Sequence, residues 1–183
     1  MGIMKNLART TVTGAVALGA ALVLLPGQAS ADEPAWWYDI RNVNSGQCLE
    51  IPGGQTHNGA PAQQWGCNGG LNQRWIHHER RNADGSVSVR YENAQARGKC
   101  LEVADWRTDP GAPLRVWDCH AGASQWWTDI PYTNSTVLRN DHSGLVADVS
   151  GDSTAYGAPV AQWNNKVWES QNANQRWRFF GYF

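Results

Sequence analysis

The sequence predicts an all-β domain made of three copies of one unit of about 50 residues, arranged around a pseudo-threefold axis. Three observations predict it: an internal repeat in register, strand-like alternation punctuated by turn residues, and no sustained apolar pattern of helical period. A unit of this size is too small to bury a core alone. Three units are therefore expected to share one core.

Four features recur in the same order in each unit. A glycine is followed by an apolar–acidic–apolar run, then a Gly-Ala-Pro triplet, a tryptophan six residues after that triplet's glycine, and a Gln-x-Trp motif. The first glycine and the last tryptophan are 29, 29 and 33 residues apart. In chain order, the acidic residues are Glu50, Glu102 and Asp148, the triplet glycines Gly59, Gly111 and Gly157, the next tryptophans Trp65, Trp117 and Trp163, and the Gln-x-Trp tryptophans Trp75, Trp127 and Trp177.

The repeat divides the chain into unit 1 (about 37–85), unit 2 (86–131) and unit 3 (132–183), and unit 3 has four extra residues around 166–169. Strands are predicted where the local pattern is clear. Residues 86–91 alternate with period two after an Asp-Gly turn signal, and residues 136–139 follow a turn cluster at 131–135. Each Gln-x-Trp is expected to start a strand that turns back into the next unit.

The four cysteines follow the same spacing, because each of the first two units holds a pair 19 residues apart. Four cysteines allow three connectivities, and equal positions in equal units favour one of them. The favoured pairs are Cys48–Cys67 and Cys100–Cys119. Each bridge would close a loop of about 20 residues and contribute roughly 3 kcal/mol in the chain-entropy model. The sequence has no Cys-x-x-Cys and no histidine at ligand spacing from a cysteine pair, so neither a metal nor a cofactor is expected.

Residues 1–31 have the features of a signal peptide. Lys5 and Arg9 precede an apolar run, and Ala29-Ser30-Ala31 provides a small-x-small cleavage site before Asp32. The run is shorter than the roughly 20 residues that span a bilayer, so a secreted, extracellular protein without membrane insertion is expected. An uncleaved anchor is the alternative that remains open.

Charge argues against a nucleic-acid partner. The chain has 15 basic and 16 acidic residues, and two of the basic ones lie in the leader, which leaves a net charge of −3 for the rest. No basic stripe is present to bind a phosphate backbone. All 11 tryptophans follow the leader, and this number requires either many core anchors or exposed stacking surfaces.

The motifs Gly-x-Cys-Leu-Glu, Gly-Ala-Pro, Trp-x-Cys and Gln-x-Trp, in this order from about residue 37 to 180, resemble the ricin-B-type β-trefoil lectin family, also met as carbohydrate-binding modules. The resemblance implies a β-trefoil with one shallow sugar pocket per unit. In each pocket an acidic residue accepts hydrogen bonds from sugar hydroxyls, an aromatic residue stacks on the ring, and an asparagine, often with a glutamine, completes the polar set. This chemistry suits a pyranose, which has a face of C–H groups and a rim of hydroxyls.

The family pattern places the more complete pockets in units 1 and 3. Glu replaces the usual Asp in unit 1, and its extra methylene is expected to carry the carboxylate further into the pocket. In unit 3, Ala161 stands in place of the optional glutamine, and Gln162 should point to the other face of its strand. The implied residues are Glu50, Gln63, Trp65, Asn72 and Gln73 in unit 1, and Asp148, Trp163, Asn174 and Gln175 in unit 3.

Unit 2 is expected to be degenerate. It keeps Glu102, Trp117 and Gln125, but Arg115 and Ser124 occupy the amide positions. In all three units the Gln-x-Trp tryptophans are expected to be core anchors, and the glutamines before them to support the pocket through backbone hydrogen bonds.

These observations predict a non-catalytic protein that binds a glycan or polysaccharide. The alternative is a trefoil that binds a protein partner, such as an inhibitor or the targeting subunit of a toxin. An enzyme is not expected, because glycosidases need two carboxylates about 5 to 10 Å apart, and the acids in register belong to different units. The cluster His77-His78-Glu79 is interpreted as a solvated strand edge.

Overall fold

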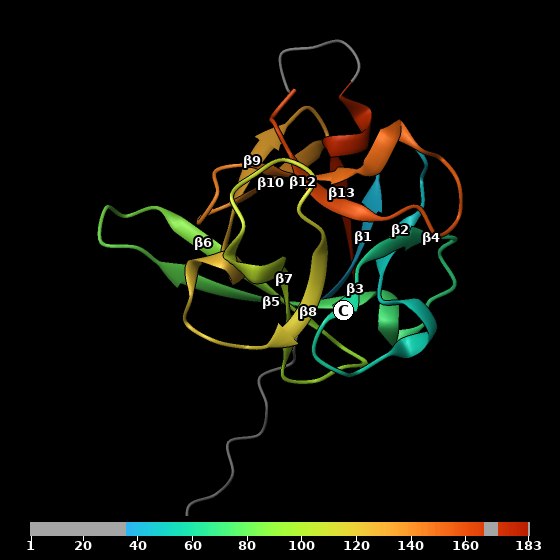
Figure 1. The fold of residues 1–183 in the computed structure, drawn as a ribbon, viewed down its shortest axis with the longest axis horizontal. Helices are drawn as coiled ribbons and strands as arrows, with labels where there is room; N and C mark the ends of the chain where they lie inside the picture. Colours follow the sequence, from blue (N-terminus) through green and yellow to red (C-terminus); the bar gives the residue numbers. More distant parts are fainter. Residues whose placement is uncertain (1–35, 167–171, 183) are drawn as a thin grey trace, which may run out of the picture. The chain divides into compact units, whose positions relative to one another are not determined.

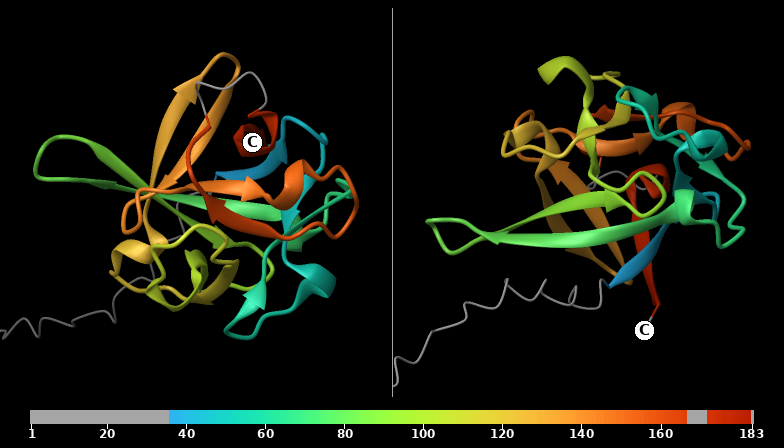
Figure 2. Two further views of the ribbon diagram at one scale, coloured as in Figure 1. Left: turned by 45° about the horizontal axis from the view of Figure 1, so that its top comes forward. Right: turned by 90° about the horizontal axis from the view of Figure 1, so that it is seen from below.

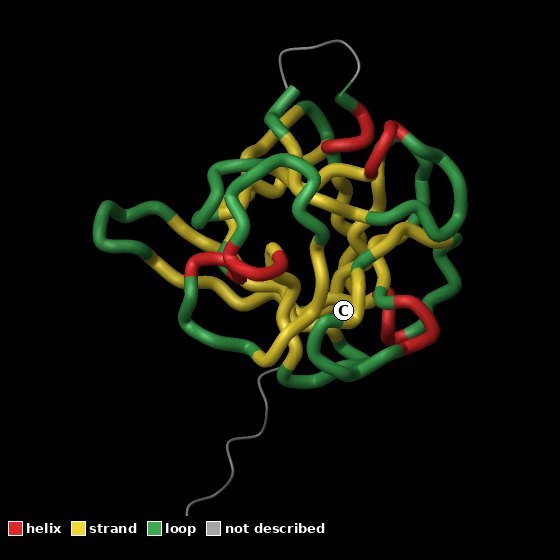
Figure 3. Tube along the Cα trace, viewed as in Figure 1, coloured by secondary structure: helices red, strands yellow, loops and turns green. Residues whose placement is uncertain are grey.

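The computed structural model describes residues 36–166 and 172–182. They form antiparallel strands joined by loops and short 3-10 turns (Figure 1, Figure 3). The predicted signal peptide and Trp168 of the unit 3 insertion lie outside the described residues. Among the described residues, no helix has the length and apolar character needed to cross a membrane.

Six strands close into a barrel. Each pairs with the next in chain order, and the last pairs back with the first. The barrel strands are β1 (Trp37–Asn42), β5 (Arg74–Arg81), β6 (Val87–Asn93), β9 (Trp127–Tyr132), β10 (Ser135–Asn140) and β13 (Trp177–Tyr182). Strand β6 contains all but the first residue of the predicted segment 86–91, and β10 contains the whole of 136–139. The β5–β6 hairpin extends beyond its neighbours (Figure 1, Figure 2).

Three further hairpins lie between the barrel strands, one in each unit. They are β2 (Cys48–Glu50) with β4 (Gln63–Trp65), β7 (Lys99–Val103) with β8 (Leu114–Asp118), and β11 (Val146–Val149) with β12 (Val160–Trp163). The short strand β3 (Ala60–Pro61) pairs with β8 and so joins units 1 and 2. Each unit thus supplies two barrel strands and one hairpin. This arrangement is a β-trefoil and confirms the predicted fold.

The barrel core is built around the three Gln-x-Trp tryptophans. All three side chains are fully buried, and each indole N–H donates to a backbone carbonyl of the hairpin in its own unit. The bonds run from Trp75 to Leu49 at 3.0 Å, from Trp127 to Leu101 at 3.3 Å and from Trp177 to Ala147 at 3.2 Å. Burial of such large rings makes a large apolar contribution to the core.

The sequence did not predict the 3-10 turns that precede three of the barrel strands, with at most one residue between turn and strand. These turns are η2 (Leu71–Gln73), η4 (Ala123–Gln125) and η6 (Ala173–Gln175). Each ends at the glutamine of its Gln-x-Trp motif, so the motif lies where a tight turn becomes a strand. The structure also contains both favoured disulfides, Cys48–Cys67 and Cys100–Cys119.

Candidate functional site

In unit 1 the carboxylate lies at the centre of a cluster of amides. Glu50 ends β2 opposite Gln63 of β4, and its side chain is almost fully buried. It accepts hydrogen bonds from Gln63 Nε2 at 2.8 Å, Asn72 Nδ2 at 3.2 Å and Gln73 Nε2 at 2.8 Å. One carboxylate thus binds amides from the strand and from the η2 turn together.

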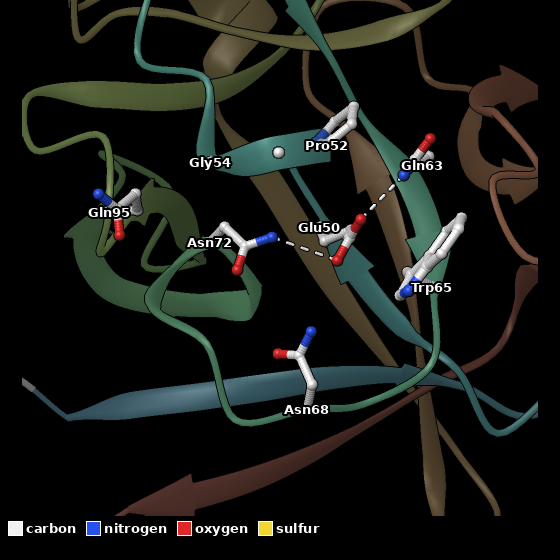
Figure 4. Close-up of a pocket in the computed structure, with 9 residues that line it drawn as sticks. Glu50, Pro52, Gly54, Gln63, Trp65, Asn68, Asn72 and Gln95 are labelled. Carbon is white, nitrogen blue, oxygen red and sulfur yellow. Dashed lines mark hydrogen bonds between the residues drawn. The ribbon is translucent and has the colours of Figure 1, made fainter.

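An open hollow of about 640 Å³ lies beside this cluster (Figure 4). Trp65 follows Gln63 by two residues and lies on the same strand face, with 40% of the residue exposed. Figure 4 shows Glu50, Asn72 and Trp65 around the open space. The side-chain amides of Gln63 and Asn72 both point at the Glu50 carboxylate. An accessible indole next to a hydrogen-bonded carboxylate provides both a stacking surface and a strong acceptor.

Unit 3 repeats the arrangement with a shorter acid. Asp148 Oδ2 accepts hydrogen bonds from Asn174 Nδ2 at 2.9 Å and Gln175 Nε2 at 2.8 Å, and Trp163 is 40% exposed. Ala161 lies opposite Asp148 and offers no amide. Burial raises the pKa of the Asp148 carboxyl, while the bonds from Gln175 and Asn174 and the charge of Lys166 oppose that rise.

In unit 2, Arg115 covers the corresponding position. Its Nε donates to Glu102 Oε1 at 2.9 Å, and a terminal nitrogen lies 3.0 Å from Asp105 Oδ1. Its Cζ is 4.3 Å from the ring centroid of Trp117. The guanidinium thus lies on the ring that would stack on a sugar and pairs with the carboxylate that would bind its hydroxyls. The loss of sugar binding in unit 2 stays a prediction, for which this arrangement gives a physical reason.

A strained turn accompanies the covered site. Asp105 and Trp106 have φ of 56° and 55°, whereas the matching residues of unit 1 are Gly53 and Gly54. Positive φ costs a non-glycine residue about 1–2 kcal/mol. The turn places the Trp106 ring against His120 with centroids 6.1 Å apart, and His120 Nε2 is 3.3 Å from Glu102 Oε2. No role was predicted for Trp106, because its place depends on a backbone conformation that its residue type disfavours.

The glutamines of the Gln-x-Trp motifs position the carboxylates. All three are fully buried, and each donates one hydrogen bond to the acid of its unit and another to a backbone carbonyl. Each also accepts a bond from a backbone N–H. The backbone bonds were expected from the sequence, whereas the bonds to the acids were not. The three pairs are Gln73 with Glu50, Gln125 with Glu102, and Gln175 with Asp148.

Three buried asparagines that sequence analysis missed also support the sites. Each side-chain amide donates to the backbone carbonyl of the residue just before a Gln-x-Trp motif, and each side-chain oxygen accepts two turn N–H groups. The signal was an asparagine four or five residues before each registered glycine. The bonds run from Asn42 to Asn174 at 2.9 Å, from Asn93 to Asn72 at 3.0 Å and from Asn140 to Ser124 at 2.9 Å.

Each of the three site tryptophans rests on a glycine from a different unit. The Gly-Ala-Pro glycines have positive φ, and a Cβ added to any of them would lie 3.3 to 3.8 Å from Cζ3 of the facing indole. Glycine here meets both the backbone requirement and the close approach. The pairs are Trp65 with Gly157, Trp117 with Gly59, and Trp163 with Gly111.

The glutamine next to each open site's tryptophan has a structural role. Gln162 is fully buried and donates to the carbonyls of Arg107 and Asp109 in unit 2. Gln64 binds the carbonyls of two unit 3 loop residues in the same way. Gln162 therefore points away from the pocket, as the strand alternation predicted.

The interpretation of His77 as part of a solvated edge is wrong. Its ring is half-buried at the end of the barrel and stacks on Tyr91, with centroids 5.5 Å apart and an interplanar angle of 4°. His78 points outward and pairs with Glu92 at 2.8 Å. Consecutive side chains of a strand point to opposite faces, so only one of the two histidines lies on the solvent face.

A family of known proteins matches most of the described part of the chain. The model of the ricin-type beta-trefoil lectin domain matches residues 36–177. The chain belongs to this lectin family.

Within the described residues, no group of three or more His, Cys, Asp or Glu side chains is arranged to hold a metal ion.

Solved structures agree on the fold. A designed threefold-symmetric protein, ThreeFoil, is 28% identical with a TM-score of 0.71, covering 78% of this chain and 96% of its own. An exo-β-1,3-galactanase from Clostridium thermocellum is 26% identical with a TM-score of 0.71, covering 81% of this chain and 30% of its own. The Rhizoctonia solani agglutinin is 21% identical with a TM-score of 0.70, covering 84% of this chain and all of its own.

A curated relative matches part of the chain. The ribosome-inactivating protein PMRIPt of Polygonatum multiflorum is 28% identical over 105 residues, which are 55% of this chain. The match spans only 15% of the length of that protein. The likeness therefore concerns a small part of that protein.

Proposed function

We propose that this protein is a secreted, non-catalytic carbohydrate-binding protein with two open sugar sites, one in unit 1 and one in unit 3. The observation that carries the proposal is the unit 1 hollow, in which an accessible Trp65 lies beside the Glu50 carboxylate and the Asn72 amide. Unit 3 has the same three kinds of group in Asp148, Trp163 and Asn174. Membership of the lectin family supports the same conclusion.

Binding at each site rests on two contacts. The C–H face of a sugar ring stacks on the exposed indole, and hydroxyls on the rim donate to the carboxylate oxygens. The amides already bound to the carboxylate fix its orientation before the sugar arrives. A shallow site that holds one ring buries little area, so each site is expected to bind weakly, and two sites on one rigid body gain strength on a glycan with matching spacing.

Binding of a protein partner is the second candidate. A surface that binds protein has no need for an acid, an exposed tryptophan and an asparagine in register in two different units. Unit 2 provides an internal comparison, because there the acid is retained but an arginine covers the ring. We therefore favour sugar binding.

The decisive experiment is a glycan array probed with the oxidised protein and three single variants. Glu50→Ala and Asp148→Ala each remove the acceptor of an open site. Glu102→Ala removes the same kind of buried acid from the covered site and is the matched control for folding. Because the galactanase relative acts on a galactan, galactose-containing glycans are the first probes.

We expect each of the two open-site variants to bind more weakly than the wild type, because each keeps one of the two sites, and Glu102→Ala to bind as the wild type does. Chromatography of the bound glycans after incubation should show no cleavage. The proposal is refuted if folded wild-type protein binds no glycan, or if all three variants bind equally well. Secretion has its own test: N-terminal sequencing of exported protein is expected to begin at Asp32, and a retained leader would contradict it.

A further inference from the structure

A second hollow, of about 530 Å³, lies away from the sugar sites. It is at the end of the barrel where β1 begins beside β5, remote from the three hairpins that carry the sugar residues. Its lining residues are Trp36, Tyr38, His77 and Glu79. None of them takes part in the proposed lectin function.

The walls of this hollow are aromatic. Trp36 is 54% exposed, and the ring of Tyr38 meets the ring of His77 edge-on with centroids 5.7 Å apart. His77 lies in turn over Tyr91 and Phe179, which close the barrel beneath it. The Nε2 of His77 is buried and has no hydrogen-bond partner. The hollow therefore has rigid ring surfaces on several sides.

The charge at the hollow is negative. Glu79 is exposed, and none of the described residues forms an ion pair with it. Asp129 of β9 lies behind His77, with 3.9 Å between its Oδ2 and Nε2 of the histidine. Burial lowers the pKa of His77, so the imidazole is neutral at pH 7.

The neighbouring basic side chains are engaged elsewhere. His78 points to the outer face and pairs with Glu92, and Arg80 lies over the ring of Trp126 at 4.1 Å. Arg81, on the same strand face as Glu79, donates to the Gly85 carbonyl in the hairpin turn at 3.2 Å. At neutral pH the lining of the hollow thus presents the Glu79 carboxylate and aromatic faces.

These residues also break the threefold repeat. The positions that correspond to Tyr38 are Val89 and Thr136, and those that correspond to Glu79 are Pro131 and Gly181. Neither the aromatic wall nor the carboxylate recurs in the other two units, although the barrel strands do. The fold does not require this set of side chains, so a separate role is the better explanation.

We propose that this hollow binds an organic ammonium group. A cation over the faces of Trp36 and Tyr38 gains cation–π attraction, and Glu79 neutralises its charge. The two sugar sites instead pair their carboxylate with side-chain amides, and this hollow has no amide in its lining. An ammonium ion needs no acceptor–donor pattern of that kind, whereas a neutral sugar does.

The test is a calorimetric titration of the mature, oxidised protein with choline chloride at constant ionic strength. Saturable binding is expected for the wild type and for Asp84→Asn, a control that removes an exposed acid from the turn of the same hairpin. Glu79→Gln and Trp36→Ala should each weaken binding by about tenfold. Glycan binding by all three variants should remain unchanged, which separates this site from the lectin sites.

Two further pairs of probes identify the source of the ammonium group. Glucosamine, which is charged, is compared with neutral N-acetylglucosamine. Lysine amide acetylated on its α-nitrogen, which keeps a charged side chain, is compared with the same compound acetylated on the side-chain nitrogen as well. Preference for the charged member of a pair supports the proposal and names the source as an amino sugar or a lysine side chain. The proposal is overturned if no ammonium probe binds, if the neutral members bind equally well, or if neither Glu79→Gln nor Trp36→Ala weakens binding.

Discussion

Replacing Asp129 by asparagine is expected to stabilise the protein at neutral pH but not at pH 4. Asp129 lies on β9, where burial raises its pKa to about 6, although the hydrogen bond that it accepts from the Tyr91 hydroxyl at 2.5 Å opposes the rise. The folded state therefore holds this proton more tightly than the unfolded chain, in which the carboxyl has its ordinary pKa of 3.8. Stability is lost as the pH rises from about 4 to 6, and the loss is complete near pH 7.

A rise of about two units corresponds to about 3 kcal/mol, which sets the upper limit for the gain in Asp129→Asn. Asparagine removes the charge and retains an oxygen that can accept the Tyr91 hydrogen bond. For a domain of this size, 3 kcal/mol raises Tm by about 6–12 °C. Thermal unfolding of both proteins at pH 4 and pH 7.5 measures the difference.

The control is Asp84→Asn, because the Asp84 carboxyl lies in an exposed turn where the hydrogen bonds from Ser86 lower its pKa. This variant should show no gain in stability at neutral pH. An equal shift of Tm at both pH values in Asp129→Asn would refute the linkage argument. A lower Tm at pH 7.5 would also refute it, because the charged carboxylate would then be stabilising.

Three other predictions concern the sites and their supports. Arg115→Gln uncovers Trp117 and supplies the missing amide, so calorimetry should count three sugars per chain instead of two. An unchanged count would mean that Arg115 is not what blocks the unit 2 site. Replacing Cys100 and Cys119 by serine should cost about 3 kcal/mol in urea unfolding, and no loss would show that the bridge adds nothing to stability. Asn93→Ala leaves buried backbone groups unpaired and should cost about 1–3 kcal/mol. It should also weaken sugar binding in unit 1, and intact binding there would contradict a supporting role.

The repeat explains why the fold could be predicted in detail. Motifs in register indicate the bounds of the three units and the strands that follow each Gln-x-Trp, and burial of Trp75, Trp127 and Trp177 follows from their size and position. Equal cysteine spacing selected the disulfide pairs in the same way. Such features depend on local sequence and symmetry, which a single chain displays directly.

Other features depend on contacts between distant residues. The sequence shows an arginine at position 115 but not that its guanidinium lies over the ring of Trp117. There it also pairs with Asp105, which is part of the strained turn. The face on which His77 lies depends on strand register, and the polar run His77-His78-Glu79 does not indicate that register. The bonds from the glutamines to the acids span more than 20 residues. The sugar-binding roles of the site residues remain predictions.

The tryptophan–glycine contacts form a closed cycle. The unit 1 ring rests on unit 3, the unit 3 ring on unit 2, and the unit 2 ring on unit 1. An ancestral single repeat would therefore have gained a complete sugar platform only by associating with further copies of itself. Transfer of one sugar site into a relative must also move two segments from different repeats. The tryptophan of a site and the glycine under its ring lie about 50 to 100 residues apart in the sequence.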